Sequence, residues 1–286
     1  MDIVEVNKHS SHIDDGNWQS FDDKEFGLLR WKDMLARKNS GSKEFVFGYA
    51  EIDAGNKMPI HRHKHTETIL IISGSAKIRA GNRNVEVGPM TGAQFPAGLP
   101  HRIEPIGLEK LCYIYTYACD ELDQTIETIL VDEVESSKIN MENDPKDRWV
   151  VTEDFEAWEP VEPSKGLKGM CVRFMFGVGK GKSDEMMAGT CRLGAGIHYT
   201  LHYHDQPEIF YCLSGHGVIY VGDQKVDVYP GVAVYIGSRV VHGADAFGSE
   251  PLLMYWLYGT KETGDKFNWT PVEDIYTESR ISSSEF

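Results

Sequence analysis

The segments GNKMPIHRHKHTETILIISG (Gly55 to Gly74) and GIHYTLHYHDQPEIFYCLSG (Gly196 to Gly215) repeat one pattern of histidine, glutamate and glycine. Every potential metal ligand in the first segment recurs 141 positions later without a gap, and one further histidine follows each segment at the same offset. The pairs are His61 and His202, His63 and His204, Glu67 and Glu208, and His101 and His242. Ligands of one ion must lie about 2.0–2.2 Å from it, so a spacing kept twice predicts the same pocket in both halves. The sequence therefore predicts two metal sites.

The surrounding residues repeat as well, which indicates a duplicated domain. Identical residues at the same offset include Gly81 and Gly222, Val85 and Val226, Val87 and Val228, Leu111 and Leu252, and Tyr117 and Tyr258. We expect an N-terminal arm at 1–44, an N-terminal domain at 45–119, a linker at 120–165, a C-terminal domain at 166–260 and a tail at 261–286.

The composition is that of an ordinary globular protein, with 41% hydrophobic and 26% charged residues in 286. There is no run of 18 apolar residues, which predicts no membrane partner. The first residues lack the basic start and apolar stretch of a secretory signal, so we expect a cytoplasmic protein. Homo-oligomerisation is left open.

The negative charge is concentrated in the expected linker. The net charge is −15, and the stretch from Asp120 to Glu162 holds fifteen acidic residues against three basic ones. An acidic surface repels polyphosphate backbones, so nucleic acid is excluded as an expected partner. Within this stretch we predict a short helix from Leu122 to Val134.

Short β-branched and aromatic runs bounded by glycine, proline and asparagine predict an all-β fold, a sandwich or barrel of antiparallel strands. The first two histidines of each set are two residues apart, so on a strand they face the same side. Four residues of straight strand would span about 13 Å, so the chain must turn between His63 and Glu67 and between His204 and Glu208. Counting by twos from each glutamate predicts that Ile69, Ile71, Phe210 and Cys212 face the barrel interior.

Other reactive residue types are interpreted as structural. The five cysteines form no CxxC pair, so we expect neither disulfides nor a thiolate metal site. His65, His198 and His216 have no counterpart at the repeat offset and are expected on the surface or in loops, and His9 and His12 lie in the polar arm. Arg173 and Arg192 could hold an anion near the second site, but a solvated position at a sheet edge is favoured for each.

Both segments resemble the first motif of the cupin family, G-x5-H-x-H-x3-E-x6-G, and PAGLPH (Pro96 to His101) resembles the core of its second motif, P-x-G-x-x-H. In the second copy GSRVVH (Gly237 to His242) keeps the histidine but lacks the proline and the middle glycine, and neither copy has the asparagine that often follows in the family. The resemblance covers residues 45–120 and 170–260. It implies a bicupin with two tandem double-stranded β-helix (jelly-roll) barrels and short helices in the arm and linker. Each barrel would hold one metal by three histidines and one glutamate.

Metal-free remnants are the alternative, because degenerate cupins that bind no ion are common in the family. Buried polar groups without partners are costly, however, which favours metal in at least one site. Imidazole with carboxylate accommodates Fe, Mn, Ni, Co, Cu or Zn, and the resemblance favours Fe or Mn, up to two ions per chain.

A divalent ion held by three neutral imidazoles and one carboxylate keeps two open positions if octahedral, which suits a small chelating substrate or one substrate atom plus dioxygen. The leading hypothesis is a dioxygenase acting on a small enolisable or hydroxylated organic compound, as in many similar bicupins. The alternative is a non-redox isomerase, lyase or hydrolase acting on a sugar acid or keto acid. A metal-dependent sensor is a third class, but the chain shows no regulatory appendage. Met58 and Tyr199 replace the arginine of the oxalate-processing bicupins, which argues against oxalate.

The C-terminal site is predicted as the seat of chemistry, because several aromatic residues follow its motif and could shape a pocket. These are Phe210, Tyr211, Tyr220, Tyr235 and Tyr255.

Overall fold

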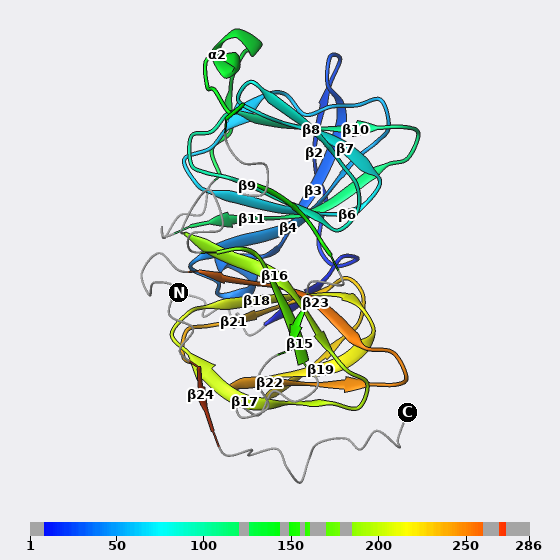
Figure 1. Ribbon diagram of the computed structural model, residues 1–286, viewed down its shortest axis with the longest axis vertical. Helices are drawn as coiled ribbons and strands as arrows, with labels where there is room; N and C mark the ends of the chain where they lie inside the picture. Colours follow the sequence, from blue (N-terminus) through cyan, green and yellow to red (C-terminus); the bar gives the residue numbers. More distant parts are fainter. Residues whose placement is uncertain are drawn as a thin grey trace.

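The computed structural model describes residues 9–119, 126–143, 149–154, 158–160, 170–177, 185–259 and 269–272. Its two β-barrels are stacked along the longest axis, the N-terminal barrel above the C-terminal one in Figure 1. Each barrel consists of a seven-stranded and a five-stranded sheet. The predicted all-β fold with two tandem barrels is confirmed. No helix in the described ranges has the length and apolar character needed to cross a membrane.

The N-terminal barrel places its candidate metal-ligand residues on both of its sheets. The seven-stranded sheet has the order β13 (Val150–Thr152), β9 (Thr91–Phe95), β6 (Glu67–Ser73), β11 (Leu111–Ala118), β4 (Phe45–Ile52), β3 (Gly27–Leu35), β2 (Gln19–Asp23). The five-stranded sheet has the order β12 (Ile129–Leu130), β5 (His61–Arg62), β10 (His101–Ile106), β7 (Ser75–Ala80), β8 (Arg83–Val87).

The C-terminal barrel repeats this plan. Its seven-stranded sheet has the order β1 (Ser10–His12), β21 (Val232–Ile236), β18 (Glu208–Ser214), β23 (Leu252–Gly259), β16 (Met186–Leu193), β15 (Met170–Phe176), β14 (Glu159–Pro160). Its five-stranded sheet has the order β20 (Gln224–Val228), β19 (His216–Val221), β22 (His242–Phe247), β17 (His198–His204), β24 (Trp269–Pro271).

The duplication extends to a strand irregularity. The register of β3 against β4 shifts between Asp33 and Leu35, and that of β15 against β16 shifts between Phe174 and Phe176. These bulges lie at the same repeat offset as the metal-ligand residues, so Asp33 corresponds to Phe174 in the second barrel. The repeat therefore reaches into the N-terminal arm, whose strand β3 is part of the first barrel.

Alternating residues of each long strand serve two different cores. The interior of the N-terminal barrel contains Ile69 and Ile71 of β6, as predicted. The interior of the C-terminal barrel contains Phe210 and Cys212 of β18, also as predicted. Their strand neighbours Leu70 and Ile209 face the opposite side, where both seven-stranded sheets bury one shared core. The two barrels are thus joined by an apolar interface rather than by the linker alone.

The predicted helix from Leu122 to Val134 is wrong where the structure describes it. Residues 120–125 lie outside the described residues, and Ile129–Leu130 form β12, which pairs with β5. Helix α2 begins only at Glu133 and ends at Ser137, after Asp132 accepts a hydrogen bond from the backbone N–H of Glu135 at 2.7 Å. Sheet pairing therefore overrides the local helical preference of this stretch. The other helix, α1 (Arg37–Ser40), lies in the arm as expected.

Candidate metal centres

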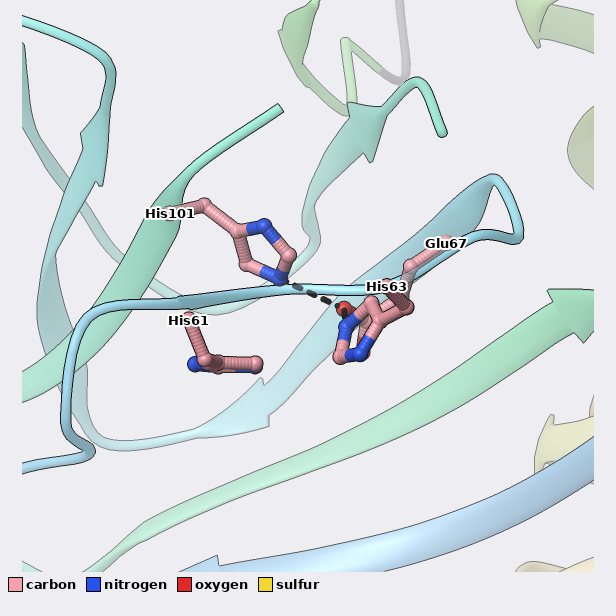
Figure 2. A group of neighbouring side chains, drawn as sticks. All are labelled: His61, His63, Glu67 and His101. Atoms are coloured by element: carbon pink, nitrogen blue, oxygen red, sulfur yellow. Dashed lines mark hydrogen bonds and ion pairs between the residues drawn. The ribbon is translucent and has the colours of Figure 1, made fainter. Parts of the chain in front are cut away.

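The N-terminal set of ligand residues comes from the beginnings of three strands. His61 begins β5, His101 begins β10 and Glu67 begins β6, while His63 lies just after β5. The chain bends at residues 64–65, so the predicted turn between His63 and Glu67 is confirmed. Figure 2 shows the four side chains pointing toward one another. Their ligand atoms all lie within 4.8 Å of each other, and all four residues are buried.

Backbone contacts fix the orientation of two imidazoles. The Nδ1 atoms of His61 and His101 lie 2.9 and 2.8 Å from the carbonyl oxygens of Pro59 and Leu99. A carbonyl only accepts, so each Nδ1 carries the proton and each Nε2 turns a lone pair into the site. Phe95 stacks on the His101 ring at 4.2 Å and holds it in place. Such support is typical of histidines that bind metal.

The glutamate contacts make this donor set fit a cation. One Glu67 carboxylate oxygen, Oε2, lies 2.9 Å from Nε2 of His101 and 3.1 Å from Nε2 of His63. Because Nδ1 of His101 donates to the carbonyl of Leu99, its Nε2 carries a lone pair, and this lone pair faces the negative Oε2 of Glu67. The lone pair and the oxygen repel each other unless a positive charge lies between or beside them. A bound divalent ion would satisfy both, so the residues present fit a metal.

Burial also sets the protonation states that a metal needs. Burial lowers the pKa of His61 well below its usual value, with further lowering from His101 and His63, and burial lowers the pKa of His63 as well. Burial alone would raise the pKa of Glu67, but its contacts with His101 and His63 outweigh this and hold the pKa below its ordinary range. Neutral imidazoles and an ionised carboxylate are the ligand forms of a divalent ion.

The C-terminal set has the same origin in the chain. His202 and His204 lie on β17, Glu208 begins β18 and His242 begins β22. The three imidazoles gather within 4.8 Å, and Glu208 Oε2 lies 3.3 Å from His204 and 3.1 Å from His242 but is not part of this closest group.

The C-terminal imidazoles are oriented by the backbone in the same way. Their Nδ1 atoms donate to the carbonyls of Thr200, Gln206 and Val240 at 2.9, 2.7 and 2.8 Å. Burial lowers the pKa of His202 well below its usual value. Burial raises the pKa of Glu208, but contacts with His204 and His242 bring it down to about 2.

A tyrosine distinguishes the second set. The hydroxyl of buried Tyr199 lies 3.3 Å from Nε2 of His202, whose Nδ1 already donates to Thr200, so the phenol must be the donor. Tyr199 therefore competes for a lone pair that a metal would use. The corresponding residue of the first barrel is Met58, which accepts from the Tyr113 hydroxyl at 3.3 Å and leaves His61 free of such competition.

A large cavity lies at the N-terminal set. A volume of about 1130 Å³ is lined in part by His61, His63 and Glu67, and by no residue of the C-terminal set. Its walls include Tyr113, Tyr115 and Tyr117, which alternate along β11; sequence reasoning missed this row, although the period of two in YIYTY could have revealed it. Burial raises the pKa of all three phenols, so they are neutral hydrogen-bond donors.

The aromatic residues expected to shape a C-terminal pocket lie mostly elsewhere. Phe210 faces the barrel interior, but Tyr211, Tyr235 and Tyr255 face the core shared by the two barrels, because they occupy the outward positions of their strands. Tyr220 donates to Asp245 at 2.7 Å. Four of these five residues therefore give no support for placing the chemistry in the C-terminal site.

Several other predictions can be compared with the structure. His198 and His216 are exposed as expected, and His65 lies in the loop between β5 and β6, one of the two expected placements, although its side chain is buried. Arg173 is not a solvated edge residue, since it pairs with fully buried Glu153 at 3.2 Å. Arg192 is exposed as expected, but its strand β16 lies between β23 and β15 and is not at a sheet edge. All five cysteines are free.

Comparisons with known proteins agree with the geometry. The family model described as Cupin domain matches residues 48–117 and 189–258. Among solved structures, the Mn(II)-containing oxalate decarboxylase of Bacillus subtilis is 17% identical, with a TM-score of 0.65 over 93% of this chain and 79% of that one. The oxalate decarboxylase of Lactobacillus farciminis, solved as a formate complex, is 15% identical, with a TM-score of 0.67 over 93% of this chain and 88% of that one.

These identities are low enough that the likeness shows the fold alone. None of the curated protein sequences matches the chain. With two matched domains, two barrels and a set of histidine and glutamate residues in each, this chain belongs to the cupin family and is a bicupin.

Proposed function

We propose that this bicupin is a metal-dependent enzyme whose chemistry takes place in the N-terminal barrel. The observation that carries the proposal is the cavity of about 1130 Å³ that reaches His61, His63 and Glu67. A reaction centre must be open to its substrate, and ligand sites are concave pockets with a few convergent polar groups. The ligands proposed for its metal are His61, His63, Glu67 and His101.

We assign the second set, His202, His204, Glu208 and His242, to a second metal that stabilises the C-terminal barrel. Tyr199 supports this assignment, because its buried hydroxyl lies 3.3 Å from Nε2 of His202 and takes up space beside the ligand set. Metal bound only by the folded state adds its binding free energy to stability.

The reaction proposed first is dioxygenation of an enolisable or hydroxylated organic compound. A bound iron or manganese ion would supply Lewis acidity toward two substrate oxygens and electrons for reaction with dioxygen. The protein would orient the substrate through Tyr117, which lies beside Glu67, with its ring 4.9 Å from that of His63. Its phenol is protonated at neutral pH, so it can donate to a substrate oxygen and hold an anionic form of the substrate in place.

A lyase or isomerase is the second candidate. The neutral phenol of Tyr117 supports it, because a hydrogen-bond donor beside the metal ligands would stabilise the negative charge of an enolate. The decarboxylases of similar fold point the same way, although oxalate itself is disfavoured, since Met58 takes the place of the arginine found in oxalate-processing bicupins.

Oxygen uptake separates the two candidates. Protein purified without chelators and then saturated with Fe(II) or Mn(II) would be assayed against enols and keto acids, with an oxygen electrode and with anaerobic product analysis. Metal-dependent uptake supports the dioxygenase. Turnover without oxygen supports the lyase or isomerase, and turnover in the metal-free protein would contradict both.

A further inference from the structure

A side chain of the C-terminal barrel contacts the chain between His63 and Glu67. We call residues 64–66 the first bend, which joins β5 to β6 and carries one candidate ligand to the next. The hydroxyl of buried Thr66 donates a hydrogen bond to the carboxylate of Glu185, which lies directly before β16. The residue beside a candidate ligand of the first barrel is therefore tied to the second barrel.

This contact has a counterpart across the same interface. Figure 1 shows β4 and β16 on the facing sides of the two barrels, whose residues share one core. Glu44 corresponds to Glu185 at the repeat offset and lies directly before β4. Its Oε2 accepts a hydrogen bond from the hydroxyl of Tyr235 on β21 at 2.7 Å. Each barrel thus reaches the other with an equivalent glutamate, but Glu185 bonds a bend between two candidate ligands, whereas Glu44 bonds a strand residue.

The second bend, residues 205–207, has side-chain supports within its own barrel. Pro207 stands at the position of Thr66, and its ring restricts the backbone dihedral φ without the help of a partner. In addition, Nδ1 of His204 donates to the carbonyl of Gln206 at 2.7 Å, which ties a candidate ligand to its own bend. These two features stiffen the second bend independently of the other barrel.

The first bend has neither of these supports. Its last residue is a threonine, and Nδ1 of His63 is buried without a hydrogen-bond partner in the part of the chain that the structure describes. The backbone contacts do not account for the difference, because they match in both bends. The matching pairs, carbonyl first and amide second, are His63 with Gly98, Thr66 with Ala118, His204 with Arg239, and Pro207 with Gly259.

We infer that Glu185 is a positioning residue of the N-terminal metal site, which acts through Thr66 on the placement of His63 relative to Glu67. The site of the first barrel is therefore complete only when the second barrel is packed against it. The inference rests on the proposed function for the presence of metal, whereas the effect of Glu185 on the first bend is independent of metal.

Titration with Mn(II) tests the effect on the site, with free Mn(II) measured by its electron paramagnetic resonance signal. The parent protein carries Glu208→Gln, which weakens the other site. In this parent, Glu185→Ala should weaken Mn(II) binding about 3- to 10-fold, less than the roughly 10–100-fold that the loss of a direct contact with a ligand costs. Glu185→Gln keeps an oxygen that can accept from Thr66, so it should retain most of the affinity.

The matched control is Glu44→Ala, the same truncation at the position related by the repeat. It removes a carboxylate from the same interface but contacts neither bend, so the Mn(II) affinity of the parent should not change. Thr66→Pro copies the second bend and should restore binding when it is added to Glu185→Ala. If that variant does not fold, Thr66→Val decides, because it should weaken binding as much as Glu185→Ala and add nothing to it in combination.

Hydrogen exchange of the metal-free protein tests the first bend itself. A segment that loses a contact opens more often, so amides at 64–67 should exchange about 3-fold faster or more in Glu185→Ala than in the wild type. Glu44→Ala should leave these amides unchanged. Melting temperatures of the two variants show how much general stability each one loses.

An unaltered Mn(II) affinity in Glu185→Ala would overturn the inference. Equal weakening by Glu44→Ala would also overturn it, because that result would indicate a general loosening of the interface. A parent protein that binds no Mn(II) would contradict the proposed function instead. The exchange rates at 64–67 would then decide the role of Glu185 alone, and rates unaltered by Glu185→Ala would count against it.

Discussion

At the scale of single residues, the two ligand sets differ less in their own residues than in their neighbours. Both sets contain three histidines supported by carbonyl contacts or packing and one glutamate with a lowered pKa. The first is next to a cavity, and the second has the Tyr199 hydroxyl at 3.3 Å from His202. We therefore expect the two sites to differ in their affinity for metal and in how easily a metal ion reaches them.

Replacing either glutamate should affect one ion only. We expect Glu67→Gln to lower the metal content by about one ion per chain, or to weaken that site roughly 10–100-fold or more, as the loss of even indirect support can do. Glu208→Gln is the matched control and should act on the other ion. Metal analysis after dialysis against defined free metal measures both, and a wild-type protein that holds one ion or none at saturation would contradict the assignment.

Removing the competing phenol should strengthen the second site. Tyr199→Phe frees Nε2 of His202 from a hydrogen bond of ordinary strength, about 0.5–1.5 kcal/mol, so metal affinity there should rise about 2- to 10-fold. Competition with a fluorescent chelator reports the change, best in the Glu67→Gln background. Weaker binding in the variant would mean that the Tyr199 oxygen itself coordinates the ion.

Acid should destabilise the metal-free protein. Burial lowers the folded-state pKa of His61 and His202 below the unfolded value of 6.5, so the unfolded chain takes up protons first. The contribution of these histidines to stability is complete above about pH 6.5 and is lost as the pH falls below it. The pKa values of Glu67 and Glu208 are also lowered in the folded state, so these glutamates act in the same direction below about pH 4.3. Urea unfolding at a series of pH values measures this, and a free energy of unfolding that stays constant down to about pH 5 would contradict it.

At the scale of elements, the motif glycines have different roles. Gly55 and Gly74 both have positive φ, 84° and 78°. A Cβ on Gly74 would lie 2.6 Å from the backbone oxygen of Lys110, whereas a Cβ on Gly55 would meet nothing within 4 Å. The hairpin between β6 and β7 passes so close to β11 that only glycine fits there.

A matched pair of alanine substitutions tests this difference. Gly55→Ala should cost only the left-handed backbone penalty, about 1–2 kcal/mol. Gly74→Ala adds the overlap with a carbonyl that cannot move without disturbing β11, so its total cost should reach about 3–4 kcal/mol. Thermal melts of both variants measure the gap, and equal melting temperatures would show that the chain around Lys110 yields.

At the scale of the whole molecule, the two barrels share a core. It contains buried residues from both seven-stranded sheets, among them Phe47 and Leu70 from the first and Ile209 and Leu257 from the second. Strand β1 of the N-terminal arm also pairs with β21 of the C-terminal barrel. Neither barrel can unfold without exposing this surface of the other.

The barrels should therefore unfold in one transition. Leu257→Ala, at a fully buried position of the shared core, should lower the free energy of unfolding by about 2–5 kcal/mol. Calorimetry should show a single peak moved to lower temperature. Two peaks, of which only one moves, would show that the barrels are independent.

Much of this protein is predictable from its amino-acid order. The repeat offset, the choice of the eight candidate ligand residues and the inward positions of Ile69 and Phe210 depend on spacing and on the period of two in a strand, both of which are local properties of the chain; that these eight residues bind metal stays a prediction. The buried position of His65 and the strand at Ile129–Leu130 were missed, because the bend and the pairing with β5 that create them depend on contacts with distant segments.

The cavity, and with it the choice between the two sites, arises only on folding. Its volume is the space left among side chains of β3, β4 and β11, which are far apart in the sequence and meet only in the barrel. A run such as YIYTY gives the direction of its tyrosines but not the size of the residues opposite them. A void depends on the sum of all facing volumes, and that sum is defined once the register of the sheets is set.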